Sequence, residues 1–462
     1  MSSVTAGQSA GSAAREAQPR SRMLAEYVAT APRRNFPPEI IDAAKVALID
    51  HVGVAVGACQ EPAARAARHV AETWKASGKA RIFNGPTTNA ALAALVNGTM
   101  AHCMDYDDTH LHGGGHISAP CWSAALAVAS DRDLDETAAL TGFITGFEVM
   151  ARIGGGGING IGRNMQKRGI HPTGVLGSVG AAAAISAMLG FDETIVGNAL
   201  GAAATSGSGL VASFGTDSKP FHAGKAAMEG ILAADLAASG FTAATHLFER
   251  GGGMVDAFIQ DRNVGVPELD FTHWELLDNG YKPFACCRAT HAPIQAAHSL
   301  TKAVGDRKVK RIVVKVHATA PFTAGKRDPK TPLECKFSVP FCIAMGLRGY
   351  RGVASDFNEE TLRDPTVRAI EPTVEMQAVA DQPQHESYLD VWLEDGEHLH
   401  AETKRFLGHP ANPMTQADHR AKFSSLVEPI FGASRASALY DTLLQFERPG
   451  ALRRLNELTA EA

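Results

Sequence analysis

Residues 177–190 read GSVGAAAAISAMLG, and this run of small and apolar side chains is the clearest indication of how the chain folds. Alanine is the best helix former, and a helix that is apolar on all sides is buried on all sides. Four more stretches share this texture and end near glycine or acidic residues: 90–102, 123–131, 137–153 and 225–240. Another helix is expected to begin at Pro37-Pro38, because proline suits a first helical turn. We predict a large all-helical domain over residues 23–272.

The pattern changes after residue 272. Residues 307–320, RKVKRIVVKVHATA, alternate as a strand does, and residues 388–402, YLDVWLEDGEHLHAE, contain two β-rich runs around Asp395-Gly396, a strong hairpin signal. Short helical patterns lie between them, near residues 335–347 and 358–370. We predict an α+β fold overall, with a smaller α+β domain over residues 273–410 and C-terminal helices over 411–462 that return to the helical domain.

Composition excludes several classes of protein. The 462 residues are 45% hydrophobic, and 44 Lys and Arg against 49 Asp and Glu give a charge of −5, so neither a disordered chain nor a nucleic-acid binder is expected. Seven cysteines, two of them adjacent at Cys286-Cys287, do not form a disulfide framework. No apolar run is long enough to span a membrane, and residues 1–22 lack the apolar core of a signal peptide. We expect a cytoplasmic protein with a disordered tail over residues 1–22.

The densest group of ionisable residues lies in AHCMDYDDTHLHGGGHISAP, residues 101–120. A carboxylate can orient an imidazole, which then moves protons near neutral pH. A polar helix end with surface histidines is the plain alternative. A metal site is a third reading, although no HExxH pair is present. The candidates are His102, Asp105, Asp107, Asp108, Thr109, His110, His112 and His116.

Residues 167–184, KRGIHPTGVLGSVGAAAA, place His171 before a long helix of small residues. Thr173 could cap that helix, and the imidazole would lie at its positive end, which suits an anion. Residues 207–230 place Lys219 in a polar loop near His222 and Lys225, where a solvated lysine is the plain alternative. The glycine-rich runs 154–162 and 207–215 do not follow a strand, so nucleotide binding is disfavoured.

Residues 281–297, YKPFACCRATHAPIQAA, contain Lys282, Arg288 and His291. The planar guanidinium of arginine suits carboxylates. A cysteine nucleophile beside His291 is disfavoured, because adjacent thiols cannot easily point into one site. The histidines and cations of these stretches fit proton transfer on a small polycarboxylate.

These four stretches, in this order, resemble the MmgE/PrpD family, which includes 2-methylcitrate dehydratase, cis-aconitate decarboxylase and iminodisuccinate epimerase. CKFSVPFCIA at 335–344 and NPM at 412–414 agree with it, and the resemblance extends from about residue 23 over nearly the whole chain. It implies a helical domain completed by the C-terminal segment, an α+β lid, a homodimer, and no metal or organic cofactor. The family's site residues fall on Asp105, Thr109, His116, His171, Lys219 and Lys282.

Two positions depart from the decarboxylase pattern. Cys287 stands where that branch has a histidine, and Phe341 stands where it has a tyrosine. Both changes remove polar groups that this branch uses, which argues against itaconate formation. Many bacterial members of the family share the segment Cys286-Cys287-Arg288, so these two changes do not identify the substrate.

The expected activity is dehydration of a hydroxy-polycarboxylate similar to 2-methylcitrate. One of His116 and His171 would remove the proton alpha to a carboxylate, and the other would protonate the departing hydroxyl. Asp105 would orient an imidazole, Thr109 would bond substrate, and Lys219, Lys282 and Arg288 would hold carboxylates. The alternatives are an epimerase or isomerase, a cis-aconitate-type decarboxylase, a metal-dependent hydrolase and a non-catalytic binding protein.

Overall fold

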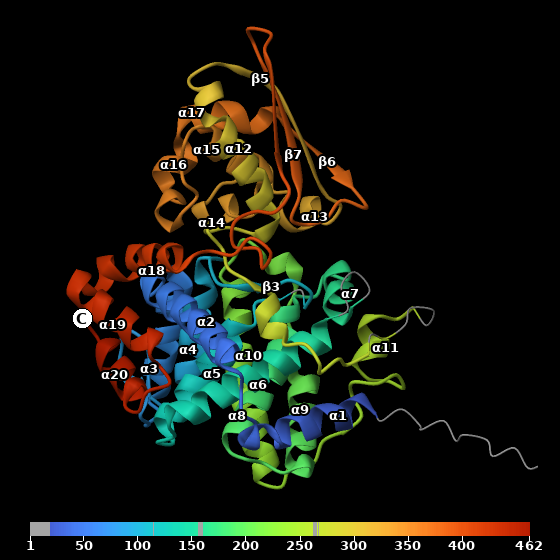
Figure 1. Cartoon of the computed structure of the whole chain (residues 1–462), viewed down its shortest axis with the longest axis vertical. Helices are drawn as coiled ribbons and strands as arrows, with labels where there is room; N and C mark the ends of the chain where they lie inside the picture. Colours follow the sequence, from blue (N-terminus) through green and yellow to red (C-terminus); the bar gives the residue numbers. More distant parts are fainter. Residues whose placement is uncertain (1–18, 114, 156–159, 262–265, 267) are drawn as a thin grey trace, which may run out of the picture.

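The chain, described here from a computed structural model, folds into a large helical lobe and a smaller lobe that contains a sheet (Figure 1). This arrangement confirms the predicted α+β class. The structure describes residues 19–113, 115–155, 160–261, 266 and 268–462. Helix α1 (Arg20–Ala29) begins inside the tail that we predicted for residues 1–22, and the rest of that tail lies outside the described residues.

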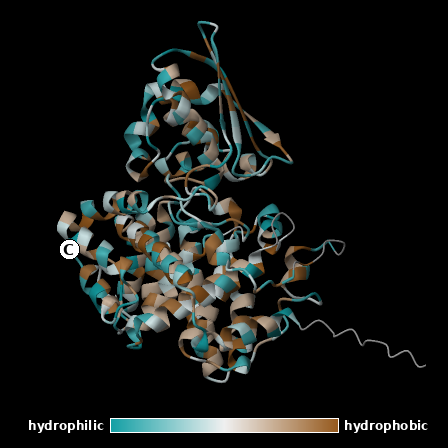
Figure 2. Cartoon of the chain, in the orientation of Figure 1, coloured by the Kyte–Doolittle hydropathy of each residue, from teal (hydrophilic) through white to brown (hydrophobic). Residues whose placement is uncertain are grey.

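The helical lobe is built around α8 (Pro172–Met188), in which every residue is buried. Small side chains make this possible, because α6 and α10 pack directly against it. Figure 2 shows hydrophobic residues distributed through the helices of this lobe. Its other helices are α2 (Pro38–Gly57), α3 (Pro62–Trp74), α4 (Ala90–Cys103), α5 (Ser118–Asp131), α6 (Glu136–Gly154), α7 (Ile161–Lys167), α9 (Glu193–Ser206), α10 (Ser218–Ala238) and α11 (Met254–Phe258).

Helices α4 and α10 cross at two glycines, and this crossing positions the site. A Cβ atom on Gly98 would lie 2.8 Å from the Cα of Gly224, and a Cβ atom on Gly224 would lie 2.0 Å from the carbonyl oxygen of Leu95. Only glycine allows so close an approach. As a result, His102 near the end of α4 lies beside Lys219 in the first turn of α10.

The smaller lobe contains a four-stranded sheet with the order β6-β5-β7-β8. The β7–β8 hairpin turns at the predicted Asp-Gly, and β5 lies in the predicted run 307–320. We did not predict β6, which pairs in parallel with β5 at the edge of the sheet. Its six residues, VEMQAV, do alternate apolar with polar side chains, but the run is short and only Val374 is buried. The strands are β5 (Val309–His317), β6 (Val374–Val379), β7 (Ser387–Leu393) and β8 (His398–Thr403).

Short helices complete the small lobe. Helices α12 and α15 pack against each other, and α12 also packs against β7 and β8. The helical patterns expected near 335–347 and 358–370 correspond to α15 and to the pair α16 and α17 (Figure 1). The bounds are α12 (His291–Val304), α13 (Ala320–Ala324), α14 (Pro332–Cys335), α15 (Val339–Leu347), α16 (Glu359–Arg363) and α17 (Pro365–Ile370).

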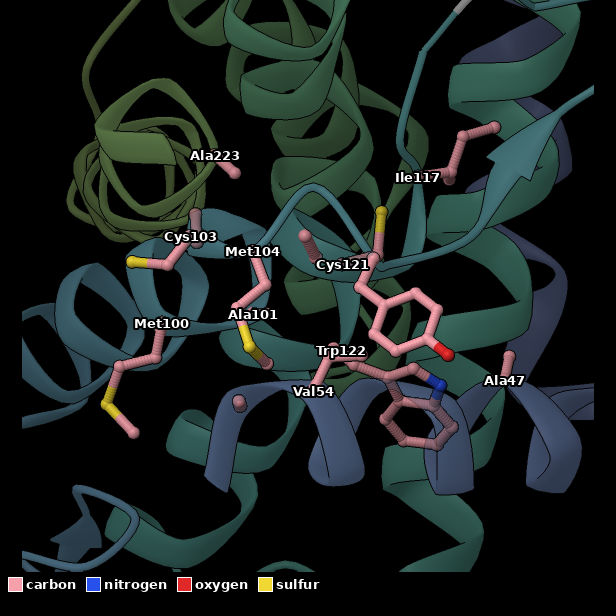
Figure 3. Packing of buried hydrophobic residues seen from close by; sticks show 14 of the residues in the cluster. Ala47, Val54, Met100, Ala101, Cys103, Met104, Ile117, Cys121, Trp122 and Ala223 are labelled. Atoms are coloured by element: carbon pink, nitrogen blue, oxygen red, sulfur yellow. The ribbon is translucent and has the colours of Figure 1, made fainter. Parts of the chain in front are cut away.

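The last helices lie against the large lobe, far in sequence from the helices they touch (Figure 1). They are α18 (Gln416–Phe431), α19 (Ala433–Leu444) and α20 (Ala451–Leu458). Helix α18 packs on α2, where a Cβ atom on Gly53 would lie 2.9 Å from the ring of Phe423. On another side of α2, Trp122 of α5 reaches the neighbourhood of Ala47 and Val54 (Figure 3). No helix of the described residues is long and apolar enough to cross a bilayer.

Candidate active site

A cavity of about 830 Å³, counting the space at its mouth, is lined by side chains from both lobes and from the segment that joins them. The seven side chains that were given a role in the expected reaction all line this one cavity. They are Asp105, Thr109, His116, His171, Lys219, Lys282 and Arg288.

The loop that follows α4 is held by lysines from three distant segments. Their ammonium groups donate hydrogen bonds to three consecutive carbonyl oxygens: Lys336 to Met104 (2.8 Å), Lys282 to Asp105 (2.8 Å) and Lys422 to Tyr106 (2.7 Å). Asp105 has a φ of 51°, a left-handed conformation that costs a non-glycine residue roughly 1 kcal/mol or more. The surrounding lysines explain how this strained backbone is kept in place.

The Asp105 carboxylate is bound by two ammonium groups. Its Oδ1 lies 2.6 Å from Nζ of Lys219 and 3.0 Å from Nζ of Lys282. Burial alone would raise the pKa of Asp105, but the charges of Lys219 and Lys282 hold this pKa well below its usual range. The nearest imidazole, that of His116, is 3.8 Å away at Nε2. Asp105 therefore orients the lysines more directly than it orients an imidazole, which differs from our expectation.

Asp107 is the carboxylate that contacts imidazoles. It was among the candidates of residues 101–120, but the sequence analysis assigned it no role. It accepts a hydrogen bond from Nδ1 of His102 at 2.8 Å and lies 3.1 Å from Nδ1 of His116. Burial lowers the pKa of His102 to about 3, even though Asp107 favours its charged form. Both residues belong to the polar stretch 101–120, but nothing in their spacing distinguished them from their neighbours.

His171 is the N-cap residue of α8, at the helix end where we expected it. Thr173 does not cap the helix, because its hydroxyl accepts the backbone N–H of His116 at 3.0 Å. Nδ1 of His171 is 3.0 Å from Nδ1 of His222, so one of the two must donate. Burial, followed by the charge of Lys219, keeps the pKa of His171 well below its usual range. The imidazole is therefore neutral near neutral pH.

Lys219 lies in the first turn of α10 and not in a loop, which corrects our prediction. The side chain is buried, and its Nζ is 3.0 Å from Nε2 of His102 as well as being bonded to Asp105. The sequence showed a lysine between polar residues and glycines. It could not show that the crossing of α4 and α10 encloses the first turn of the helix.

Three further residues that the sequence analysis selected also line the cavity. Thr109 lies on β3 (Thr109–His110), which pairs with β4 (Asn279–Gly280), and its hydroxyl has no hydrogen-bond partner among the described residues. Burial alone would lower the pKa of Lys282, but Asp105 and then Asp107 raise it, so this group stays an ammonium ion. Nη1 of Arg288 donates to the carbonyl oxygen of His110 at 3.3 Å.

Comparison with known proteins agrees with this geometry. The MmgE/PrpD N-terminal domain matches residues 22–266, and the MmgE/PrpD C-terminal domain matches residues 284–446. The chain belongs to the MmgE/PrpD family. Cis-aconitate decarboxylase of Homo sapiens is 30% identical over 72% of this chain and 71% of its own length, and that of Mus musculus is 27% identical over 72% and 70%. The Aspergillus terreus enzyme is 22% identical over 92% of each chain. This membership confirms the predicted resemblance and makes the chain a lyase.

The two departures from the decarboxylase branch of MmgE/PrpD differ in their consequences. Cys287 lines the cavity, and burial raises the pKa of its thiol to about 11, so the group is neutral and a poor nucleophile near neutral pH. Phe341 is buried in α15 and does not line the cavity. Cys286 is buried outside the cavity, with its Sγ 2.9 Å from Oγ1 of Thr290. Neither adjacent cysteine is placed for nucleophilic attack.

The polar cluster fits a metal ion poorly. Ligand atoms of His102, Asp105, Asp107 and His116 lie within 4.8 Å of one another. However, the Lys219 ammonium group contacts Oδ1 of Asp105 and Nε2 of His102, and Lys282 contacts the same Asp105 oxygen. These lysines occupy the directions from which a cation would be bound, and their charges would repel it.

The remaining members of the polar stretch support the fold. Asp108 is buried and accepts hydrogen bonds from Ser118 and Asn279. His110 is fully buried and accepts the backbone N–H of Gly113 at 2.8 Å. Both residues have structural roles, but they are buried, so the surface histidines of the plain alternative are represented in this stretch by His112, which is exposed. The glycine-rich run 154–162 lies partly outside the described residues.

The buried histidines predict a loss of stability in acid. Burial lowers the pKa of His51 and His102 to about 3 and that of His222 to about 4. Below pH ~6.5 the histidines of the unfolded chain bind protons that those of the folded chain do not. The free energy of unfolding therefore decreases as the pH is lowered, by up to ~1.4 kcal/mol per pH unit for each group. Burial raises the pKa of Asp108 to about 7 and also raises that of Glu148, which acts in the opposite direction, but these two groups are outnumbered by the histidines whose pKa burial lowers.

Thermal unfolding between pH ~6.5 and ~4.5 measures this effect. We expect the melting temperature to fall, and to fall less steeply in the His51→Leu variant. His51 suits this comparison because neither ring nitrogen has a hydrogen-bond partner among the described residues and the ring lies outside the cavity. A melting temperature that is independent of pH, or an unchanged slope in the variant, would contradict this account.

Proposed function

We propose that this chain removes water from a small hydroxy-polycarboxylate, with a 2-methylcitrate-like compound as the leading substrate. The observation that carries the proposal is the position of a neutral, buried imidazole, that of His171, on the same cavity as the ammonium groups of Lys219 and Lys282. A neutral imidazole can accept a proton, and ammonium groups attract carboxylates and the charge that develops on them.

The first step is abstraction of the proton alpha to a carboxylate by Nε2 of His171. For this atom to be the acceptor, Nδ1 must carry the proton and donate it to Nδ1 of His222, across the 3.0 Å that separates them. The electron pair left on carbon is delocalised into the carboxylate, which becomes an enediolate. Lys219 and Lys282 would stabilise that charge. Asp105 keeps both ammonium groups in place.

The second step is loss of the hydroxyl from the neighbouring carbon. His116, in its protonated form, would give its proton to the hydroxyl, so that the C–O bond breaks and water leaves. Burial lowers the pKa of His116, and the Asp107 carboxylate, 3.1 Å from Nδ1 of His116, partly offsets this shift by favouring the protonated form. Thr109 would bond the substrate through its unpartnered hydroxyl. The proton taken by His171 and the one lost by His116 are then exchanged with solvent, which restores the starting state.

Decarboxylation of a cis-aconitate-like acid is the second candidate. The relatives named above support it, since their names state this activity. Cys287 argues against it, because a neutral thiol replaces an imidazole on the wall of the cavity. The two reactions share the binding of carboxylates by lysines and differ in the bond that breaks.

A substrate screen monitored by NMR in D₂O separates these activities. We expect citrate-like acids to give alkene signals, while the signal of the hydroxyl-bearing carbon disappears. Conversion of cis-aconitate with release of CO₂ would favour the second candidate instead. Exchange of the alpha proton of an imino- or hydroxy-diacid without a new alkene would indicate an epimerase. Absence of turnover on every citrate-like acid would refute the dehydration proposal.

A further inference from the structure

Two arginines lie at the mouth of the cavity, where it meets a second, outer hollow. Arg163 on α7 and Arg288 on the joining segment line both spaces, whereas Lys219 and Lys282 line only the inner one of the two. The arginines are held side by side by the backbone. Nη2 of Arg163 donates to the carbonyl oxygen of Leu111 at 3.4 Å, and Nη1 of Arg288 donates to that of His110, the preceding residue.

No carboxylate of the described residues forms an ion pair with either arginine. The other hydrogen bonds of Arg163 go to neutral amide oxygens, those of Gln166 at 2.9 Å and Gln384 at 2.8 Å. Nε of Arg288 is buried and has no partner among the described residues. Both side chains are partly buried; a partly buried cation without a counter-ion is destabilised, and a second cation beside it adds to this cost.

The electrostatics of the pair agree with this geometry. Burial lowers the pKa of Arg163 to about 10 and that of Arg288 to about 9, and the charge of Arg163 contributes to the shift of Arg288. Within the part of the chain that is described, two carboxylates line the cavity. Asp105 is already bound by the lysines, and Glu386 accepts the hydroxyl of Tyr388 at 3.0 Å. Asp381 lines the outer hollow, but neither it nor Glu386 forms an ion pair with Arg163 or Arg288, so the arginine pair has no bound counter-ion among the described residues.

We propose that Arg163 and Arg288 form a second carboxylate subsite, which binds the end of the substrate remote from the reacting carbon. This inference rests on the proposed function, because it takes the lysines to hold the reacting end. The amide oxygen of Gln384, which comes from the loop between β6 and β7, stands where one oxygen of that carboxylate would be bound. The subsite makes the enzyme selective for tricarboxylates over dicarboxylates that lack the remote group.

Two unreactive analogues isolate the subsite from the chemistry. Propane-1,2,3-tricarboxylate and methylsuccinate differ by one terminal carboxylate, and neither carries a hydroxyl group to eliminate. Isothermal titration calorimetry gives the Kd of each. We expect wild-type protein to prefer the tricarboxylate, and Arg163→Gln to lose roughly 10-fold or more of that preference, as the loss of a charge-assisted bond predicts. The affinity for methylsuccinate should remain within about 3-fold of wild type.

Arg288→Gln provides a second variant with the same expected result, in case Arg163→Gln fails to fold. Arg168→Gln is the matched control, since it removes the same charge next to α7 from an exposed residue that does not line the cavity. The subsite is refuted if the preference for the tricarboxylate is unchanged in the folded variants, or if both analogues weaken equally. A wild-type protein that binds neither analogue would overturn the proposed function as well, so the two failures are distinguishable.

Discussion

The His171→Asn variant is expected to lose about 10³-fold of kcat on whichever substrate the wild-type enzyme converts, because loss of a general base typically costs 10²- to 10⁴-fold. Asparagine is similar in size but cannot accept the proton. The substrate carboxylates would still meet Lys219 and Lys282, so KM should change little. Steady-state kinetics measure both quantities.

The control is His69→Asn, which changes an exposed histidine of α3 outside the cavity and should leave kcat unchanged. Wild-type turnover in a folded His171→Asn enzyme would remove His171 from the mechanism. A second outcome would also count against a chemical role for His171: kcat and the melting temperature both fall, and they fall by equal amounts in His171→Asn and in His69→Asn.

The largest effect on stability is expected for Lys422→Met. Nζ of Lys422 lies 2.6 Å from Oδ1 of Asp50, and both side chains are almost fully buried, at 4% and 1% exposure. Removing the lysine leaves a buried carboxylate without a partner and takes a donor from the carbonyl oxygen of Tyr106. Breaking a buried pair in this way typically costs about 3–5 kcal/mol.

Denaturant unfolding of three variants tests this prediction. Lys422→Met should be the least stable, and the double variant Asp50→Leu with Lys422→Met should recover part of the loss because no charge remains buried. Arg307→Met, which breaks exposed ion pairs to Asp395 and Glu397, should leave the unfolding midpoint nearly unchanged. Equal effects of Lys422→Met and Arg307→Met would show that the buried pair does not stabilise α18 against α2.

Much of the fold could be read from local patterns. Runs of alanine and glycine predict helices that pack closely, and the Asp395-Gly396 turn predicts a hairpin whatever surrounds it. Strand β6 was missed although its residues VEMQAV alternate, because the run is only six residues long and Val374 is its one buried side chain. Its place in the sheet is set by pairing with β5, which is a property of the whole domain.

The site was predictable only where motifs mark it. The seven residues selected from four stretches all line the cavity, while their chemical roles stay predictions. Asp107 lies within the same stretch as Asp105, but burial decides which carboxylate meets the imidazoles. Arg163 stands beside a glycine-rich run with no recognisable motif, and Lys336 and Lys422 reach the loop after α4 only through tertiary packing. Such residues have no local signal in a sequence.

The most direct test of the central claim is a crystal structure of the enzyme with propane-1,2,3-tricarboxylate bound. The claim is that imidazoles and lysines from distant parts of the chain surround one small polycarboxylate. We expect one carboxylate within ion-pair distance of Lys219 and Lys282, with Nε2 of His171 facing an adjacent carbon atom. A compound bound at another surface, or one that contacts neither lysine, would contradict the account.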